Sequence, residues 1–598
     1  MANSVAKRIL ELRKVMKKEG ANWYFCTSDD FHASEYVADY FKVREYYTGF
    51  TGENAFLLLN EDKAMMWTDG RFFIQADIEL KGTGVELMKM GEPDVPGISE
   101  YIKDNLKCGE TLFFDGRMVS TSLGKTIEAI AKENGAKIIF DRDIAGPLWT
   151  DRPNLPSNPI LILSDEITGE SINSKLSRIR KEMKKCNAKY HFLGSIDDIA
   201  WITNMRGRDV SCNPVFLSYL LITEDNAVIF MQDSEASKEV KEYLVSNGFT
   251  IESYSDVLNT LNNYSFEGSL LLDEGSVNYS CYKTLSEKTE LINSINPSKL
   301  FKAVKNETEI NRLKEAYLED SVCVTKFCYW LKNEVKKGTV TEISAAEYID
   351  NLRRQIPGFM DLSFPTISGY GSNGAIVHYG VTEESNTPVK PEGLLLVDSG
   401  GQYEKGTTDV TRTIACGEVT DKMRLHYTKV AVGMLTLANA RFLYGCTGRN
   451  LDILTRAPLW NMGMDYKHGT GHGVGYILNV HEGPQNIRWK FPEGTKEYVI
   501  EPGMITSDEP GVYISGEYGI RIENIILCVK DVLNSDGQFL KFEHLTYAPL
   551  DRALLDKSCL NDYELSLVNE YQKLVYEKMK GHLTKEEDEW LKEETKEL

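Results

Sequence analysis

Apolar and polar positions follow the same order twice within the first half of the chain. Apolar residues recur at helical spacing over residues 4–19 and again over 171–186. Each predicted helix is followed by a short strand, a turn with an Asp-Asp pair, a β-hairpin that turns at Glu-Asp, and a further helix, over residues 21–80 and 188–240. A repeat distance of about 165 residues is far longer than the roughly 20–50 residues of a solenoid repeat. The pattern therefore predicts two copies of one αβ domain.

The pattern changes near residue 300, and such changes mark the expected domain boundaries. The segment DRPNLPSNP at 151–159 is rich in proline and asparagine, which is typical of a linker. A second boundary falls at 296–310, where an extended stretch meets a helix start. Beyond it we predict helices over 307–336, 341–356 and 420–443, with short strands between them. The predicted domains are residues 1–152, 157–298 and 303–554, followed by a charge-dense helical tail over 555–598.

Length and composition restrict the class of protein. A chain of 598 residues is too long for one hydrophobic core, and 42% hydrophobic with 26% charged residues is ordinary for a soluble globular protein. The net charge of −21 argues against nucleic acid or an anionic membrane as a partner. The N-terminus lacks the apolar core of a secretory signal, and no run of about 18 apolar residues occurs, so we expect a cytoplasmic protein. The eleven cysteines are scattered without a CxxC pair, which indicates neither a disulfide scaffold nor a cysteine zinc site.

Acidic residues lie at the ends of predicted strands in the last half of the chain. Asp398 ends the apolar run at 394–397, which has the pattern of a buried strand. Asp409 precedes the β-branched run at 410–414, another predicted strand. A turn near 403–406 would therefore bring both carboxylates to the same end of one hairpin.

A second predicted hairpin repeats this arrangement. Glu509 opens a Glu-Pro-Gly turn after the strand predicted over 504–507, and Glu523 lies on the strand predicted over 520–528. Buried carboxylates are costly unless they are paired or bind a metal. His472, which has glycines on both sides, adds one imidazole to the four carboxylates. A set so rich in oxygen favours two divalent cations such as Mn²⁺, and paired cations are common in hydrolases.

Three more histidines lie in the same stretch of the chain as His472. They are His378, His468 and His481, and each taken singly would more often be a structural histidine. Beside a group of metal ligands, however, histidines stabilise charge or transfer protons. We interpret the remaining histidines as surface or packing residues: His32, His191, His426, His544 and His582.

The five candidate ligands stand in a distinctive order, Asp, Asp, His, Glu, Glu. With their surrounding phrases LLLVDSGG, TTDVTRT, HGTGHGVG, TSDEPGVY and GIRIEN, they resemble the pita-bread metallopeptidases, which include methionine aminopeptidase, prolidase and Xaa-Pro aminopeptidase. The chain is most similar to the long, three-domain cytosolic Xaa-Pro aminopeptidases. The likeness extends to GFTGENAFLLL, WTDGRFFIQA, DDIAWITNMRG and NPVFLSYLLI, so it covers essentially the whole chain. It implies an α+β or α/β architecture, with two creatinase-like N-terminal αβ domains followed by a C-terminal pita-bread metallopeptidase domain.

The resemblance implies a role for each of the five ligands. Asp398 would bind one cation, and Asp409 and Glu523 would bridge both. His472 and Glu509 would complete the shell of the other cation. A water or hydroxide that bridges the two cations would be the nucleophile, with Glu509 as its general base. We expect Mn²⁺ in both positions, although Zn²⁺ or Co²⁺ can use the same ligands.

The resemblance also implies a peptide substrate with proline in the second position, from which the N-terminal residue is removed. His378 and His481 would hold the scissile carbonyl group and its developing oxyanion. His468 would be a further catalytic residue and would line the proline pocket together with Tyr513. Arg521 would lie close to this pocket.

Two more residues have one functional and one structural interpretation. Arg71 in WTDGR resembles a substrate-contacting arginine that the first domain supplies, and the alternative is a surface ion pair. Trp460 resembles an aromatic residue that reaches the cleft of a neighbouring subunit, and the alternative is core packing. Since members of the family are often dimeric, the resemblance implies a homodimer.

Two rival hypotheses stay open at this point. Some proteins keep this fold, lose the ligands and act as histone-binding or growth-related adaptors, and the net acidity would fit such a role. The presence of all five ligands and of the additional histidines argues against it. The nearer rival is a prolidase, an enzyme limited to dipeptides, which normally carries one N-terminal domain rather than two.

Overall fold

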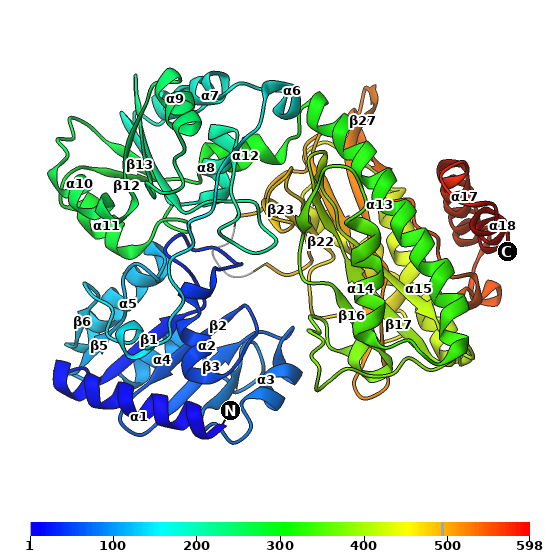
Figure 1. Cartoon of the computed structure of the whole chain (residues 1–598), viewed down its shortest axis with the longest axis horizontal. Coiled ribbons are helices and arrows are strands. Elements are labelled where there is room, and N and C mark those ends of the chain that lie inside the picture. Colours follow the sequence, from blue (N-terminus) through cyan, green and yellow to red (C-terminus); the bar gives the residue numbers. More distant parts are fainter. Residues whose placement is uncertain (1, 492–495) are drawn as a thin grey trace. The chain divides into compact units, whose positions relative to one another are not determined.

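The computed structural model describes residues 2–491 and 496–598 (Figure 1). The chain divides into two compact units, each with its own sheets and core. Unit 1 contains the chain up to Asp165 together with residues 170–299, and unit 2 contains residues 166–169 and 300–598. The chain passes from one unit to the other within α6 (Asp165–Thr168), again just after α6 at residues 169–170, and within α12 (Pro297–Ala303).

The first αβ domain of unit 1 is built on a six-stranded sheet in the order β4-β3-β2-β1-β5-β6. The central strand β1 is antiparallel to β2 and parallel to β5. The elements are α1 (Ala2–Glu19), β1 (Trp23–Thr27), α2 (Val43–Thr48), β2 (Ala55–Leu59), β3 (Ala64–Thr68), α3 (Phe73–Glu79), β4 (Glu86–Lys89), α4 (Ile98–Asn105), β5 (Thr111–Phe113), α5 (Thr121–Asn134) and β6 (Lys137–Ile139).

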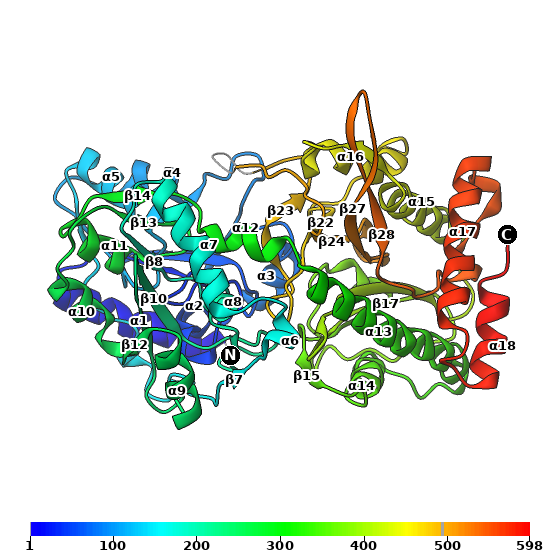
Figure 2. The same cartoon turned by 90° about the horizontal axis from the view of Figure 1, so that it is seen from above.

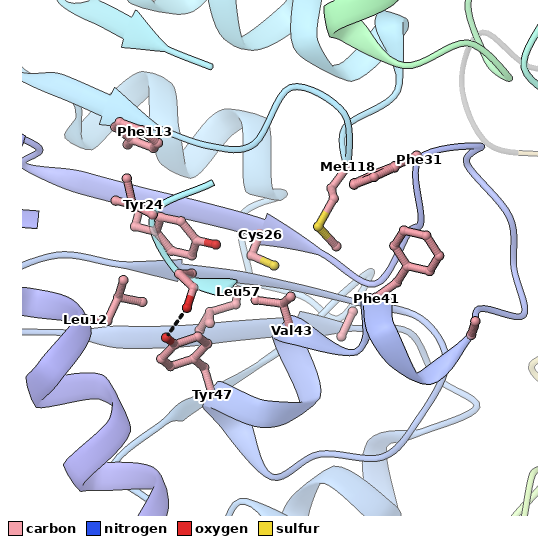
Figure 3. Close-up of a cluster of buried hydrophobic side chains, with 14 of the residues drawn as sticks. Leu12, Tyr24, Cys26, Phe31, Phe41, Val43, Tyr47, Leu57, Phe113 and Met118 are labelled. Atoms are coloured by element: carbon pink, nitrogen blue, oxygen red, sulfur yellow. Dashed lines mark hydrogen bonds between the residues drawn. The ribbon is translucent and has the colours of Figure 1, made fainter. Parts of the chain in front are cut away.

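Helix α1 forms as its apolar spacing predicts. The residues that gave the pattern are all buried: Val5, Ile9, Leu12 and Met16. They belong to a core that includes Tyr24 and Cys26 of β1. In the same core the Tyr47 hydroxyl donates to the carbonyl oxygen of Ala145 at 2.9 Å (Figure 3). The helix is therefore held by an apolar face that the sequence alone identifies.

The second αβ domain repeats this sheet in the order β12-β11-β10-β8-β13-β14. Its central strand β8 is again antiparallel to one neighbour, β10, and parallel to the other, β13. The duplication predicted from the repeat is therefore confirmed. The elements are β7 (Leu161–Ile162), α7 (Ile172–Lys185), β8 (Tyr190–Leu193), α8 (Ile196–Thr203), β9 (Met205–Arg206), β10 (Ser218–Thr223), β11 (Ala227–Met231), α9 (Lys238–Ser246), β12 (Phe249–Ser253), α10 (Val257–Asn263), β13 (Leu270–Leu272), α11 (Tyr279–Ser286) and β14 (Leu291–Asn293).

The Asp-Asp pairs of the two copies have different structures, and the prediction of a turn was wrong for the second. In the first copy Asp30 accepts hydrogen bonds from the backbone N–H groups of His32 and Ser34 in an irregular segment. In the second copy Asp197 and Asp198 lie in the first turn of α8. Carboxylates are favoured there by the positive end of the helix dipole, so the same two residues suit either structure.

The long helices of unit 2 begin close to the predicted positions. Helices α13 (Glu307–Glu334) and α14 (Glu342–Arg353) each start at a capping box, in which the side chains of Asn306 and Thr341 accept from the third backbone N–H. Helix α15 (Asp421–Ala438) ends before the predicted residue 443. Residues 441–443 instead pair as strand β21 with β28, so this part of the prediction was wrong. Helices α16 (Gly448–Trp460), α17 (Asp562–Met579) and α18 (Lys585–Glu594) follow.

The strands of unit 2 form a six-stranded sheet, β21-β28-β27-β24-β22-β23, two three-stranded sheets, β16-β17-β20 and β15-β18-β19, and the pair β25-β26. Strands β17 and β20 form the predicted hairpin, with Asp398 opposite Thr411. The strands are β15 (Phe359–Leu362), β16 (Ile367–Tyr370), β17 (Leu394–Ser399), β18 (Gly401–Tyr403), β19 (Gly406–Thr407), β20 (Val410–Ala415), β21 (Arg441–Leu443), β22 (Gly471–Gly473), β23 (Glu482–Ile487), β24 (Ile505–Asp508), β25 (Gly511–Ile514), β26 (Tyr518–Arg521), β27 (Asn524–Asn534) and β28 (Gly537–His544).

The sequence predicted that Glu523 lies on one continuous strand over 520–528, and this prediction was wrong. Glu523 lies in the break between β26 and β27, and Glu509 lies in the matching break between β24 and β25. β24 pairs with β27, whereas β25 pairs with β26 in a separate sheet. Pro510 has no N–H with which to continue the ladder, so the strand ends beside it. Both glutamates therefore lie where the chain passes from one sheet to another.

The C-terminal tail forms α17 and α18, which pack against the rest of unit 2 (Figure 2). Their apolar residues belong to the same core as residues of α15 and β26: Leu567, Val568, Tyr571, Val575, Met579 and Leu591. The acidic side chains of Glu586, Glu589 and Glu593 are exposed, as expected for a solvated helix face. The tail is thus an integral part of unit 2.

Two expectations from composition can be compared with the structure. No two of the eleven cysteines form a disulfide bond, which agrees with their scattered spacing. Among the described helices, none combines the length and the apolar character that crossing a membrane requires.

Glu594 joins α18 to the body of unit 2 through a half-buried carboxyl group. Its side chain accepts a hydrogen bond from the backbone N–H of Arg552 at 2.7 Å and lines a small cavity with Lys332 and Asp551. Burial first, and then the charge of Asp551, raise the pKa of Glu594 from 4.5 to about 7, while Lys332 and Arg552 act in the opposite direction. Because the pKa is higher in the folded state than in the unfolded chain, folding is favoured at low pH and loses this advantage as pH rises from 4.5 towards 7.

We therefore predict that Glu594→Gln, which stays neutral, gains thermal stability relative to wild type as the pH rises. The melting temperature of the variant minus that of wild type should increase between about pH 5 and pH 8. The exposed neighbour Glu593→Gln serves as the control, and its difference should stay flat. A pH-independent difference for Glu594→Gln would contradict the assignment.

Candidate metal centre

The four predicted acidic ligands and His472 converge in unit 2. Asp409, His472 and Glu523 each offer one ligand atom, and these atoms all lie within 4.8 Å of one another. His472 Nε2 lies 3.7 Å from Asp409 Oδ2 and 3.4 Å from Glu509 Oε1. Asp398 lies on β17, opposite Thr411, whose hydroxyl contacts Glu523. We call Asp398, Asp409, Glu509 and Glu523 the carboxylate cluster.

Glycines allow the strand that carries His472 to approach its neighbours closely. A Cβ atom at Gly471 would lie 1.8 Å from the carbonyl oxygen of Ser507 on β24. A Cβ atom at Gly473 would lie 2.2 Å from the carbonyl oxygen of Glu482 on β23. Both distances are far below any real contact, so the glycines on both sides of His472 are required by the packing of β22.

The carboxylate cluster is buried enough to be electrostatically unstable by itself. As whole residues, Asp398, Asp409 and Glu523 are 9%, 4% and 2% exposed. Burial first, and then the neighbouring carboxylates, raise the pKa of Asp409 and of Glu523 well above the usual range. Burial also raises the pKa of Glu509 to about 7. Without added positive charge, the cluster would hold protons near neutral pH.

The donor set fits divalent cations. Asp398 Oδ1 is buried and has no hydrogen-bond partner among the described residues, so one acceptor atom is left for a ligand. Carboxylate oxygens with one imidazole suit Mn²⁺ and similar ions, and no thiolate lies among them. Cations would also replace the protons that the raised pKa values indicate.

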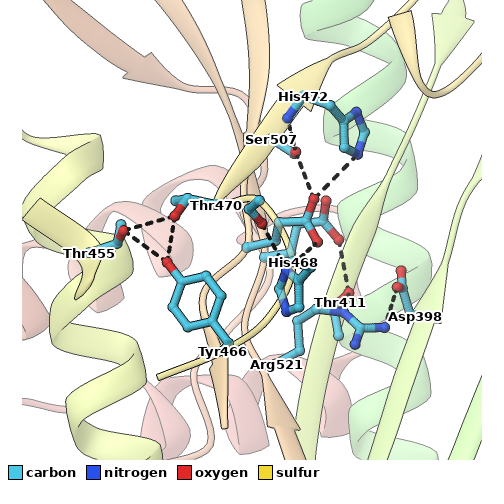
Figure 4. Close-up of polar contacts among 12 residues, drawn as sticks. Asp398, Thr411, Thr455, Tyr466, His468, Thr470, His472, Ser507 and Arg521 are labelled. Atoms are coloured by element: carbon cyan, nitrogen blue, oxygen red, sulfur yellow. Dashed lines mark hydrogen bonds and ion pairs between the residues drawn. The ribbon is translucent and has the colours of Figure 1, made fainter. Parts of the chain in front are cut away.

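His472 and Glu509 are oriented by groups outside the cluster. His472 Nδ1 lies 2.9 Å from the carbonyl oxygen of Gly473, which leaves Nε2 facing the carboxylates. The Ser507 hydroxyl accepts from the backbone N–H of His472 at 2.9 Å and donates to Glu509 Oε1 at 3.1 Å. One serine therefore fixes two candidate ligands (Figure 4).

Arg521 connects the carboxylate cluster to Tyr513 and His468. Its guanidinium group donates to Asp398 Oδ2 at 2.6 Å and to the Tyr513 hydroxyl at 2.9 Å. The Tyr513 hydroxyl lies 2.8 Å from His468 Nε2, and His468 Nδ1 lies 2.8 Å from the carbonyl oxygen of Gly469. Burial and the charge of Arg521 hold the pKa of His468 well below its usual range. His468 is therefore neutral, with both ring nitrogens already occupied.

The other two predicted histidines also lie near the cluster. The His481 ring lies 4.4 Å from the His472 ring, centroid to centroid, in an edge-on arrangement. His481 lies within electrostatic range of Asp409 and Glu509, and His378 lies within electrostatic range of His468. The structure thus brings His378, His468 and His481 to the same site.

Arg71 and Trp460 have different surroundings from these residues. Arg71 belongs to unit 1 and forms ion pairs with Asp69 at 2.9 Å and with Glu35 at 3.8 Å. A substrate contact for Arg71 stays a prediction. Trp460 ends α16 with 39% of its surface exposed and lies edge-on to Trp489 at 5.9 Å. The core-packing alternative for Trp460 is therefore wrong, and contact with a second subunit stays a prediction.

Several residues that support the candidate ligands were not predicted from the sequence. Ser507 and Thr411 lie two positions from Glu509 and Asp409, so the two-residue period of a strand could have indicated them. Glu482 directly follows His481 and is buried against the ammonium groups of Lys302 and Lys305. These lysines are distant in sequence, and no local pattern indicates that pairing.

Comparison with known proteins covers nearly the whole chain. Residues 8–139 and 151–309 each match a Creatinase/Prolidase N-terminal domain. Residues 311–530 match metallopeptidase family M24, and residues 538–598 match the C-terminal region of peptidase M24. These ranges follow the predicted order of domains, while the predicted boundaries themselves stay predictions.

Full-length relatives decide the family. The chain is 36% identical to "Xaa-Pro aminopeptidase 1" of Dictyostelium discoideum over 100% of this chain and 97% of the relative. It is also 36% identical to "Aminopeptidase P2" of Arabidopsis thaliana, over 96% of this chain and 86% of the relative. The chain belongs to the Xaa-Pro aminopeptidase family of M24 metallopeptidases. The predicted family and the predicted class of enzyme, a hydrolase of the metallo-aminopeptidase type, are confirmed.

One solved structure matches the architecture of the whole chain, and another matches part of it. The crystal structure of an X-prolyl aminopeptidase from Caenorhabditis elegans, described as a cytosolic enzyme with a di-nuclear active site, matches with a TM-score of 0.94 and 31% identity. The match covers 99% of this chain and all of that one. An Xaa-Pro dipeptidase from Bacillus anthracis matches at 25% identity with a TM-score of 0.51, over 64% of this chain and 99% of its own. The predicted fold of two creatinase-like domains and one M24 domain is confirmed.

The position of Glu523 generates a direct prediction. Glu523→Ala removes one of the three groups whose ligand atoms lie within 4.8 Å of one another, so bound metal and nearly all activity should be lost together. Elemental analysis after Mn²⁺ loading and desalting measures the first effect, and turnover measures the second. The control is Glu517→Ala, an exposed carboxylate paired with Lys422, which should behave as wild type. Wild-type turnover in Glu523→Ala would refute the ligand assignment.

Proposed function

We propose that the chain is an Xaa-Pro aminopeptidase that removes the N-terminal residue from peptides with proline in the second position. The observation that carries this proposal is the convergence of Asp398, Asp409, His472, Glu509 and Glu523 in one largely buried site. This site lies in a chain that is 36% identical along its full length to a protein named Xaa-Pro aminopeptidase.

We further propose that the five residues hold two divalent cations, Mn²⁺ in the first instance. The oxygen-rich set and the orphaned Asp398 Oδ1 support this choice, as does the di-nuclear active site described for the Caenorhabditis elegans relative. Zn²⁺ or Co²⁺ can use the same ligands. When bound, the two cations lower the pKa of water and polarise the scissile carbonyl group.

Glu509 is the general base of the proposed reaction. It lies 3.4 Å from His472 Nε2 and 4.0 Å from His468 Nδ1, at the edge of the cluster. The Ser507 hydroxyl holds one of its oxygens, Oε1. A carboxylate that is held in place beside the attacking water can accept its proton. Glu509 would later return that proton to the leaving nitrogen.

The three histidines outside the ligand set have different roles in the proposed reaction. His481, beside His472, and His378 would hold the scissile carbonyl group and its developing negative charge. His468 has both ring nitrogens occupied by Tyr513 and Gly469, so we assign it to the wall of the proline pocket rather than to proton transfer. Tyr513 and Arg521 would support that wall.

Proline specificity follows from the chemistry of the scissile bond. An amide before proline has no N–H, so a site that needs this donor loses one hydrogen bond with such a substrate. A site built around the pyrrolidine ring, as we propose here, has no such requirement. The free amino group of the substrate would be held near the cations and Asp398, which would account for the removal of a single residue.

We also propose a cytosolic homodimer with peptide substrates as its ligands. The description of the Caenorhabditis elegans relative as cytosolic supports the location. The exposed, mutually contacting Trp460 and Trp489 support a contact with a second copy, since exposed aromatic residues are favoured at interfaces. The net charge of −21 disfavours nucleic acid as a partner.

The substrate proposal predicts a preference for tripeptides over dipeptides. With Mn²⁺ present, the protein should release the first residue from an Xaa-Pro-Yaa peptide and cleave the matched Xaa-Pro dipeptide more slowly. An Xaa-Ala-Yaa peptide is the specificity control and should be a poor substrate. Cleavage of the dipeptide alone would indicate a prolidase, and inertness toward all three after Mn²⁺ addition would indicate an adaptor.

The role proposed for His481 predicts that replacing this residue lowers turnover without loss of bound metal. His481→Ala should lower kcat by about a hundredfold or more while two cations stay bound, because the imidazole acts on the substrate and the ligands are unchanged. His426→Ala is the control: that histidine is buried on α15 and contacts Tyr518. Equal losses of metal and turnover in His481→Ala would show that His481 is structural.

A further inference from the structure

Helix α16 carries a buried ion pair that is outside the proposed reaction chemistry. Arg456 Nε donates to Asp452 Oδ2 at 2.6 Å, and the two side chains are 1% and 0% exposed. Buried pairs of this kind are weak evidence for stability, because desolvation offsets much of the attraction. The role of the Arg456–Asp452 pair therefore follows from its contacts with other residues of unit 2 rather than from the strength of the pair itself.

The cation of this pair holds the segment that carries His468. Arg456 donates to the backbone carbonyl oxygens of Tyr466 and His468, both at 2.9 Å. Its guanidinium carbon also lies 3.8 Å from the centre of the Tyr466 ring, and that ring lies 4.9 Å from the His468 ring. Arg456 thus holds the backbone of His468, and the Tyr466 ring packs beside its imidazole.

The anion of the pair holds the other end of the same segment. Asp452 Oδ1 accepts from the Thr470 hydroxyl at 2.5 Å, and the Tyr466 hydroxyl lies 2.5 Å from the same Thr470 oxygen. The backbone carbonyl of Thr470 accepts from the N–H of Glu509 at 2.8 Å. Figure 4 shows Thr470 and Tyr466 between α16 and the site. The segment is therefore fixed at both ends, on either side of His468.

We propose that Arg456, Asp452 and Thr470 are positioning residues, which set the place of His468 and of the Glu509 backbone for catalysis without touching the substrate. The inference rests on the proposed function, because it uses the assignment of His468 to the proline pocket and of Glu509 to the reaction. A displacement of about 1 Å in such groups costs up to about a hundredfold in rate. The ligand side chains are untouched, so the effect falls on kcat.

Thr470→Val tests the proposal with the smallest change, since it removes one buried hydroxyl and keeps the backbone carbonyl that Glu509 uses. In the Mn²⁺-loaded enzyme, kcat for an Xaa-Pro-Yaa peptide should fall about tenfold or more, with KM changed by less than about threefold. Bound metal per chain, measured after desalting, should stay at the wild-type value. The control is Thr325→Val, which removes an equally buried hydroxyl on α13 that donates to Ser321.

Arg456→Lys and Arg456→Met provide the second arm. Lysine keeps the charge and some donors, so it should retain more turnover than methionine. If Arg456→Met does not fold, because Asp452 is left buried and unpaired, Asp452→Asn with Arg456→Met removes both charges and should show the same loss of kcat.

The outcomes separate this inference from the proposed function. A wild-type protein inert toward Xaa-Pro-Yaa overturns the function. An active wild type with Thr470→Val no slower than Thr325→Val overturns the positioning role. Metal loss in proportion to the loss of turnover also overturns it, because the α16 pair would then act through metal binding alone.

Discussion

Mutual repulsion among four carboxylates, three buried and one half-buried, is the constraint on which this site depends. Asp409, Glu509 and Glu523 all have pKa values raised by burial, with neighbouring carboxylates adding to the shift. The guanidinium of Arg521 compensates one charge at Asp398, which leaves the remainder to be balanced by cations or protons. A fold that places these groups together near neutral pH is therefore suited to bind divalent cations, and its local irregularities follow from that requirement.

The irregularities occur where the ligands lie. The sheet breaks at Glu509–Pro510 and again at Ile522–Glu523, so that both glutamates leave the strand ladders at the same place. Glycines beside His472 remove the side chains that would separate β22 from its neighbours. Ser507, Thr411 and Thr470 then hold ligands or their backbone from outside the cluster. Most of the precision of the site resides in these supporting contacts rather than in the ligands.

The local sequence pattern predicted the fold and the candidate metal ligands. It did not predict the contacts that hold those ligands in place. Helical spacing predicted α1 and α7, and strand ends followed by acidic residues predicted the ligands. Prediction failed where two structures compete for the same residues, as at Asp197 and at the end of α15, and where a strand breaks at Glu523. The Asp452–Arg456 pair and the contact of Glu482 with Lys305 depend on tertiary packing, which no local spacing encodes.

The most direct test of the central claim is anomalous diffraction from crystals of the protein loaded with Mn²⁺, recorded to locate the metal ions. The account predicts two anomalous peaks about 3.5–4 Å apart, surrounded by Asp398, Asp409, His472, Glu509 and Glu523. A single peak, or peaks at other residues with this cluster left empty at saturating Mn²⁺, would contradict it.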